Sequence, residues 1–240
     1  MLPLDRQHAL RDRYARLAPH YRHSGLVYEE MFAEVIRPAS DVLDAGGGRS
    51  GVIGKYRASL GRAVCLDVDH PSLRDNRTGA GLVCGRLEAL PFSTAQFDVI
   101  LCTWVVEHLA DPDRAFAELS RVLRPGGYLL ILTPSTRNYL IWLNRLFPSG
   151  LRPTLVRWFY AREEEDTFPA YYRANTRAAL DQALARVGLV PDRVEHIGDP
   201  TYLGMSPLLF WPAVAYERLT DLPQLREGKV HLVARFAKRP

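Results

Sequence analysis

The chain has 240 residues, 47% of them hydrophobic and 24% charged, which is ordinary for one globular domain with a full core. Its formal net charge of +4 is mildly basic, but arginine alternates with acidic residues along most of the sequence, which argues against a nucleic-acid partner. Apolar runs stay shorter than the roughly 18 residues that a transmembrane helix needs, and the polar N-terminus is unlike a signal peptide, so we expect a cytoplasmic protein without a transmembrane segment.

Helical spacing of apolar residues over 5–37 predicts an N-terminal helical cap, assigned to residues 1–37. Five apolar runs then predict buried strands, at 42–46, 63–68, 81–85, 97–104 and 128–133. Between the last two, "DPDRAFAELSRVLRPGG" predicts a helix, because an acidic start and a Pro-Gly-Gly end mark both of its limits. A helix over about 174–187 and strands near 190–197 and 229–237 follow.

Strands that alternate with helices predict an α/β fold with a doubly wound, mostly parallel sheet of seven strands. The chain is then a single domain, 1–240, with its core in 38–133 and the last part of the sheet in 174–240. Two segments fall outside the repeat, an aromatic insertion at 134–173 and a helical insertion at 198–228. In the second, Ser206 and Pro207 are placed as the cap and first turn of a helix.

The three cysteines, Cys65, Cys84 and Cys102, fall inside apolar runs and show no C-x-x-C spacing. This pattern favours buried thiols in a reducing compartment over disulfides or a metal site.

The stretch "LDAGGGRSG", 43–51, has the glycine spacing that brings a ligand close to the backbone N–H groups of a strand-to-helix turn. Two cofactors fit it, a dinucleotide and S-adenosylmethionine, and Asp67, 21 residues after Gly46, suits the ribose of either. Asp44 changes the balance, because a carboxylate at the strand end repels a pyrophosphate and attracts an ammonium or sulfonium group. The acid therefore favours the cationic cofactor.

The segment "LEALPFSTAQFDVILCTWVVEHLADPDRAFAELSRVLRPGGYLLILTPS", 87–135, closely resembles the class I S-adenosylmethionine-dependent methyltransferases. Within that family it is similar to the small-molecule branch that includes quinone and sterol methylating enzymes. The resemblance implies a Rossmann-like fold, S-adenosylmethionine as cofactor with S-adenosylhomocysteine as product, and methyl transfer to an O, N or C atom of a small molecule.

The resemblance also implies a cofactor site. It assigns the methionine end to Asp44, Gly46 and Gly48, the ribose to Asp67, the adenine to the backbone N–H of Leu87, the methionine half to Thr103 and Trp104, and closure over the cofactor to Tyr21. The chain departs from the family at Ser50, where the turn usually has its third glycine, and at Arg86, where an aspartate commonly accepts from the adenine amino group. Arginine has no acceptor, so it must stack on the ring, pair with Glu88 or point away.

His108 follows the fourth strand and is the candidate general base; the alternative is a structural role at a helix start. The aromatic insertion suggests an acceptor that is bulky and partly apolar, with Trp142, Tyr171, Tyr172 and Arg173 as candidate contacts. Four arginines are candidates to meet an acidic group on it: Arg137, Arg145, Arg173 and Arg177. Alternatively, the two insertions pack on each other or form a homodimer contact.

The acidic run at 161–166 is interpreted as a solvated turn, so no metal is expected. A nucleic-acid methyltransferase is disfavoured, because "CTWVVEH" stands where the amino-methylating enzymes have an Asn- or Asp-Pro-Pro-aromatic motif. A non-catalytic domain that binds cofactor or a partner, and an NAD oxidoreductase, remain as alternatives.

Overall fold

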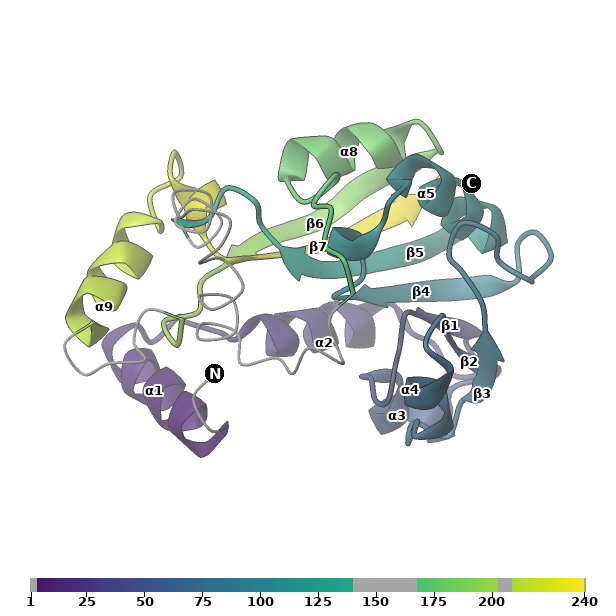
Figure 1. Cartoon of the computed structure of the whole chain (residues 1–240), viewed down its shortest axis with the longest axis horizontal. Helices are drawn as coiled ribbons and strands as arrows, with labels where there is room; N and C mark the ends of the chain where they lie inside the picture. The colour runs from purple at the N-terminus through teal and green to yellow at the C-terminus, as the bar shows by residue number, and fades with distance from the viewer. Residues whose placement is uncertain (1–3, 140–167, 203–208, 240) are drawn as a thin grey trace.

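The computed structural model describes residues 4–139, 168–202 and 209–239, which build a seven-stranded sheet with helices on both faces (Figure 1). The strand order is β3-β2-β1-β4-β5-β7-β6. The strands are β1 Val42–Ala45, β2 Ala63–Asp67, β3 Gly81–Cys84, β4 Phe97–Thr103, β5 Leu123–Pro134, β6 Leu189–Ile197 and β7 His231–Lys238. This confirms the predicted doubly wound fold, and β5 begins earlier than the apolar run that predicted it.

The first five strands are parallel, whereas β7 runs antiparallel between β5 and β6. The chain runs outward from β1 through β2 to β3 and then returns to place β4 on the other side of β1. In an open α/β sheet, ligands bind outside the carboxyl ends of the strands at such a reversal. Asp44 on β1 is in register with Cys65 on β2 and Leu101 on β4, so the ends of these strands meet at one edge.

The described helices are α1 Leu4–Leu17, α2 Ser24–Val35, α3 Ile53–Tyr56, α4 His70–Arg74, α5 Pro112–Val122, α8 Arg177–Ala185 and α9 Phe210–Leu219. In Figure 1, α5 and α8 lie over one face of the sheet and α2 lies under the other. Local signals set several of the starts, because Asp111 accepts from the Arg114 N–H ahead of α5 and Thr176 accepts from the Ala179 N–H ahead of α8. No described helix is long and apolar enough to cross a membrane.

The prediction that all three cysteines are buried is wrong for one of them. Cys65 and Cys102 are buried, but Cys84 is exposed. Cys84 closes β3, which is an edge strand with a single neighbour, so its apolar run lacks the cover that a central strand receives.

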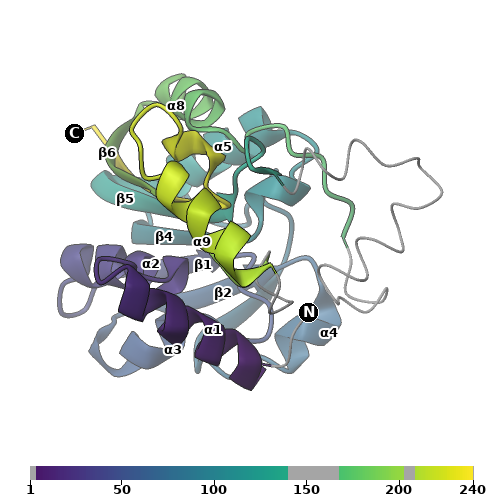
Figure 2. The same cartoon turned by 90° about the vertical axis from the view of Figure 1, so that its left-hand side faces the viewer.

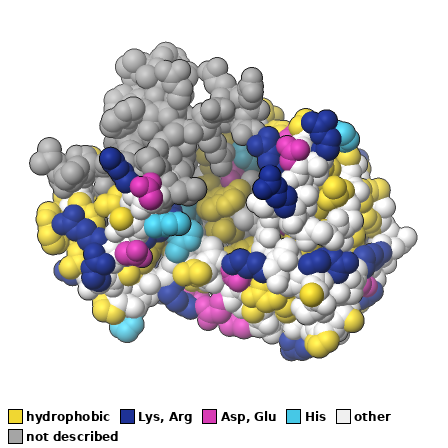
Figure 3. All heavy atoms as spheres, turned by 90° about the horizontal axis from the view of Figure 1, so that it is seen from below, with side chains coloured by type: hydrophobic (Ala, Val, Ile, Leu, Met, Phe, Trp, Pro, Cys, Tyr) yellow, Lys and Arg dark blue, Asp and Glu magenta, His cyan; other side chains and the backbone are white. Residues whose placement is uncertain are grey.

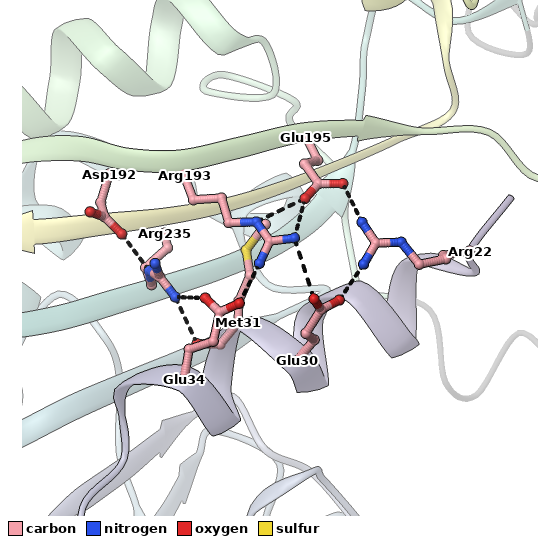
Figure 4. A network of polar contacts seen from close by, with 8 residues as sticks. All are labelled: Arg22, Glu30, Met31, Glu34, Asp192, Arg193, Glu195 and Arg235. Carbon is pink, nitrogen blue, oxygen red and sulfur yellow. Dashed lines mark hydrogen bonds and ion pairs between the residues drawn. The ribbon is translucent and has the colours of Figure 1, made fainter. Parts of the chain in front are cut away.

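A network of ion pairs joins α2 to β6 and β7 (Figure 4). Arg193 on β6 contacts Glu34 at 2.7 Å and Glu195 at 2.5 Å, and Arg235 on β7 contacts both Glu34 and Asp192 at 2.5 Å. Arg22 and Glu30 extend the network along α2. Surface pairs are weak singly, but a network with shared partners holds the helix in one orientation. This matters because the start of α2 forms a wall of the cleft described below.

Helices α1 and α9 pack on each other beyond the carboxyl ends of β4 and β5 (Figures 1 and 2). Tyr14 on α1 is buried against Phe210 and Val214 on α9. The predicted N-terminal cap is thus α1 plus α2, and the helix of the second insertion begins at Phe210. The predicted cap at Ser206 and Pro207, like most of the aromatic insertion, lies outside the described residues.

Candidate active site

A cleft of about 1520 Å³ opens at the carboxyl ends of β1, β2 and β4. Viewed from below, the molecule is hollowed near its centre, with hydrophobic side chains in the hollow (Figure 3). The cleft brings together most of the predicted site, and the predicted residues that line it are Asp44, Gly46, Gly48, Asp67, Leu87, Thr103, Trp104, His108 and Tyr171. Residues far apart in the sequence therefore form one site, because most of them lie at or shortly after the ends of strands that meet at this edge, whereas Tyr171 is held there by the Glu107 carbonyl.

The glycine turn after β1 forms the floor of the cleft, and packing explains its composition. A Cβ on Gly46, which has φ +81°, would lie 2.2 Å from Cγ2 of Val105. A Cβ on Gly51 would lie 2.3 Å from Oδ2 of Asp44. The glycines therefore let the turn fold tightly over the Asp44 carboxyl and against the start of the segment after β4.

Asp44 ends β1 beneath this turn and is only 2% exposed. Burial raises the pKa of Asp44 to about 7, and the nearby Asp67 adds to the effect. Both causes disfavour the carboxylate, so a bound cation would stabilise the ionised form. The position suits an ammonium or sulfonium group and opposes a pyrophosphate.

Asp67 closes β2 and holds the other side of the turn. Its Oδ2 accepts from the N–H of Gly48 at 2.9 Å, and its Oδ1 accepts from the N–H of Asp69 at the same distance. A carboxylate fixed by backbone donors at the end of β2 is placed to accept further hydrogen bonds from ribose hydroxyls. The predicted ribose role for Asp67 is compatible with this arrangement.

The end of β4 carries a strained aromatic residue in the cleft wall. Trp104 has φ +58°, a conformation that large side chains seldom adopt and that concentrates at functional sites. Its N–H donates to the Leu132 carbonyl at 2.8 Å, and its ring packs edge-on to His231 at 4.9 Å. Trp104 lines the cleft while one edge of its ring contacts the buried His231.

Two cleft residues from the start of α2 were missed in the sequence. Tyr28 is buried, and its hydroxyl accepts from the Cys102 N–H at 3.1 Å and donates to the Leu130 carbonyl at 3.4 Å. His23 caps α2, since its Nδ1 accepts from the Gly25 N–H. Tyr28 belongs to the apolar face of a predicted helix, and no pattern marked it or His23 as cleft residues.

The adenine side of the predicted site contains Leu87, which is buried, with Arg86 and Glu88 beside it. The Arg86 side chain is 68% exposed, and its Nε lies 3.5 Å from Oε2 of Glu88. Of the three expectations for Arg86, the pairing with Glu88 is observed, with the arginine side chain largely in solvent. The Glu88 carboxylate, itself mostly buried, remains in the cleft wall as an acceptor.

His108 lies in a short 3-10 turn, Val106–His108, just after β4. Its Nδ1 is 3.0 Å from the Pro169 carbonyl. A carbonyl only accepts, so Nδ1 carries the proton, and the neutral ring has its lone pair on Nε2. The histidine is thus held in the tautomer that a base needs.

The neighbouring Glu107 performs a structural task. Its buried carboxylate accepts from the Thr133 hydroxyl at 2.9 Å, and its carbonyl accepts from the N–H groups of Tyr171 and Tyr172. The segment 168–172 is thereby fixed over the cleft next to His108.

The candidate acceptor contacts divide into three groups. Tyr171 lines the cleft, Tyr172 and Arg173 do not, and Trp142 lies outside the described residues. Arg173 donates instead to the Ala110 carbonyl at 2.5 Å. Of the other arginines expected to meet an acidic group, Arg137 pairs with Glu227 and Arg177 with Asp181, both at 2.7 Å, whereas Arg145 is outside the described residues.

Tyr21 does not line the cleft. Its ring packs edge-on to Tyr14 at 4.9 Å, and its hydroxyl is buried without a hydrogen-bond partner, in the layer between α1 and α9. His23, two residues later, occupies the cleft wall in its place. The described residues contain no cluster of three potential metal ligands, and the acidic run at 161–166 is outside them.

Residues 43–131 match the family model of a methyltransferase domain. The malonyl-[acyl-carrier protein] O-methyltransferase of Enterobacter lignolyticus is 34% identical over 193 residues, which cover 77% of this chain and 70% of that enzyme. The chain belongs to the class I S-adenosylmethionine-dependent methyltransferases. The ubiquinone/menaquinone biosynthesis C-methyltransferase of Shewanella frigidimarina is 33% identical over 112 residues of this methyltransferase, 42% of the chain and 45% of that enzyme.

Solved structures agree on the fold. The geranyl diphosphate C-methyltransferase of Streptomyces coelicolor, solved with Mg2+, geranyl diphosphate and S-adenosyl-L-homocysteine, superposes with a TM-score of 0.56 at 17% identity, over 89% of this chain and 77% of that one. The cofactor of this methyltransferase is S-adenosylmethionine, and the cleft suits it in its glycine turn and in its buried acid. The matched part is less than half the length of the Shewanella enzyme, so the reaction and the acceptor of that enzyme do not carry over to this chain.

Proposed function

We propose that the protein transfers a methyl group from S-adenosylmethionine to a small-molecule acceptor that is bulky and partly apolar. The observation that carries this proposal is that one cleft is lined by two chemically different sets of residues. One part of the lining is the glycine turn with Asp44 and Asp67, and another part is Trp104, His108 and Tyr171. A charged cofactor fits the first part and an aromatic or aliphatic acceptor fits the second.

The residues of the first part bind and orient. Asp44 would hold the ammonium end of the cofactor, Asp67 its ribose hydroxyls, and the Leu87 N–H its adenine ring. Glu88 supplies the carboxylate acceptor on the adenine side, where the family commonly has an aspartate at the position of Arg86. When bound, the cofactor supplies an already activated methyl group on a sulfonium, so alignment and exclusion of water are the main tasks left to the protein.

His108 would remove the proton of a hydroxyl or phenol acceptor. The Pro169 carbonyl holds the proton on Nδ1, which leaves Nε2 as the acceptor atom. The ring of His108 therefore needs no reorientation when Nε2 takes a proton, because Nδ1–H stays bonded to the Pro169 carbonyl before and after the transfer.

The apolar wall supports the acceptor class. Leu26 and Phe168 line the cleft with Trp104 and Tyr171, and their exposed fractions show that the cleft presents apolar surface to a ligand. The names of two relatives point the same way, since one acts in quinone biosynthesis and the other is a geranyl diphosphate C-methyltransferase.

Two measurements test the proposal. Calorimetry with S-adenosylmethionine and S-adenosylhomocysteine should show binding of both, and a screen of phenols, quinols and isoprenoid compounds should yield a product heavier by one methylene group. A folded protein that binds neither nucleoside would contradict the proposal and support a non-catalytic domain. If the protein binds both nucleosides but methylates no compound of the panel, only the proposed acceptor class is wrong.

A further inference from the structure

The outward face of α9 and the turn after it exposes five large apolar side chains, with Arg218 and Asp221 exposed among them. Trp211 is 59% exposed, Leu219 52% and Leu222 50%, and Leu209 and Leu225 are also exposed. The inward face carries Phe210, Ala213, Val214 and Glu217, all buried. Half of the large exposed hydrophobic residues of the described chain thus lie within 209–225, although single exposed side chains are normal elsewhere.

A row of arginines on α1 borders this apolar face. Arg6, Arg13 and Arg16 are exposed and spaced seven and three residues apart, so they share one side of the helix. The Arg13 guanidinium lies 3.9 Å from the centre of the Phe210 ring and 5.9 Å from that of Trp211. Packing of α1 on α9 therefore places the arginines next to the exposed tryptophan.

The acids of α1 border the arginine row on one side. Asp5 and Asp12 are seven residues apart and lie about a quarter turn from Arg6 and Arg13, whereas Arg16 follows Asp12 by four residues and shares its side of the helix. At the left end of Figure 3, basic side chains run among hydrophobic ones, with acidic side chains close by. The combined surface is cationic and apolar.

We propose that this α1–α9 surface (Arg6, Arg13, Arg16, Leu209, Trp211, Leu219, Leu222 and Leu225) docks on a phospholipid bilayer that carries anionic headgroups. Trp and Leu side chains enter the headgroup boundary, while arginines beside them pair with lipid phosphates. A bilayer suits an exposed apolar face rimmed by cations better than a protein partner, whose interface core is poor in charge.

The position of the surface links it to the site. Helices α1 and α9 lie beyond the carboxyl ends of β4 and β5, the edge at which the cleft opens (Figures 1 and 2). A molecule docked through this surface would therefore turn the edge of its sheet that carries the cleft toward the bilayer. The inference concerns membrane binding alone and stands whether or not the proposed reaction is correct.

Sedimentation with vesicles tests it. The full chain should sediment with vesicles of phosphatidylcholine mixed with phosphatidylglycerol, bind phosphatidylcholine alone less well, and detach as salt is raised. Arg6→Gln with Arg16→Gln should weaken binding about 25-fold, at about fivefold for each charge. Trp211→Ser with Leu222→Ser should weaken it by about tenfold or more.

Matched controls come from the opposite end of the sheet. Leu82→Ser on β3 removes an exposed leucine, and Arg74→Gln with Arg77→Gln removes two exposed charges, so these variants should bind vesicles like the wild type. All substituted positions are exposed, and unchanged melting temperatures confirm the fold. Equal binding by the α1–α9 variants and the controls would overturn the proposal. So would a wild-type dimer that Trp211→Ser dissociates in the absence of lipid, which would assign the surface to a second copy of the chain.

Discussion

The pH dependence of cofactor binding follows from the burial of Asp44. Burial and Asp67 raise the pKa of Asp44 to about 7 in the free protein, and only the ionised form attracts the cofactor ammonium. About one tenth of the molecules carry the Asp44 charge at pH 6 and about nine tenths at pH 8. The ligand α-amino group has an ordinary pKa of about 8, so it is itself mostly charged up to that point. We expect the dissociation constant to fall by about fivefold to tenfold between pH 6 and pH 7.5, and to rise again above pH 8.

Calorimetry with S-adenosylhomocysteine at several pH values measures this effect. In buffers of different ionisation enthalpy, binding near pH 6.5 should release most of one proton, because the ammonium draws Asp44 into its charged form. Asp44→Asn should weaken binding at pH 7.5 by about 1.5–3 kcal/mol, as expected for a hydrogen bond to a charged group. It should also abolish the rise in affinity between pH 6 and 7.5.

Glu217→Gln is the matched control for this experiment. Burial also raises the pKa of Glu217 to about 7, but this acid pairs with Lys229 at 3.4 Å, outside the cleft. The control should keep the wild-type pH profile. A dissociation constant that stays flat from pH 6 to 7.5 in the wild type would refute the assignment of the ammonium to Asp44.

Three further outcomes are expected. Asp44→Asn should raise the free energy of unfolding of the ligand-free protein at pH 8 by up to about 4 kcal/mol, as measured by urea titration. The gain should fade toward pH 4, because a carboxyl whose pKa is raised in the folded state destabilises the wild type as the pH rises to about 7. Equal gains at pH 8 and pH 4 would contradict this. Gly51→Ala places a Cβ 2.3 Å from Oδ2 of Asp44 and should lower the stability measured by thermal melting by about 1–3 kcal/mol. It should also weaken cofactor binding. A fully stable variant would argue against the geometry of the turn. His108→Gln should lower kcat about hundredfold or more while the cofactor Kd from calorimetry changes less than about twofold, and undiminished turnover would return His108 to a structural role.

The sequence alone determined the fold and most of the cofactor side of the cleft. Apolar runs and the Asp111 cap are local signals that specify their own elements, whereas the helix predicted to end at Pro-Gly-Gly ends at Val122 and the Pro-Gly-Gly residues belong to β5. Parallel strands then align their carboxyl ends, so Asp44 and Asp67 could be assigned to one site without coordinates, and the resemblance to the family added Trp104.

Only the tertiary structure decided which side chains from outside the sheet reach that site. His23 and Tyr28 enter the cleft because the network around Arg193 fixes α2, and Tyr21 leaves it because α9 packs on α1. The partners of Arg137 and Arg173 have the same origin, since Arg137 pairs with Glu227 and Arg173 donates to the Ala110 carbonyl 63 residues away, whereas Arg177 pairs within its own helix. Contacts between segments so distant leave no periodicity in the sequence, because they depend on how finished elements pack and not on how each one forms.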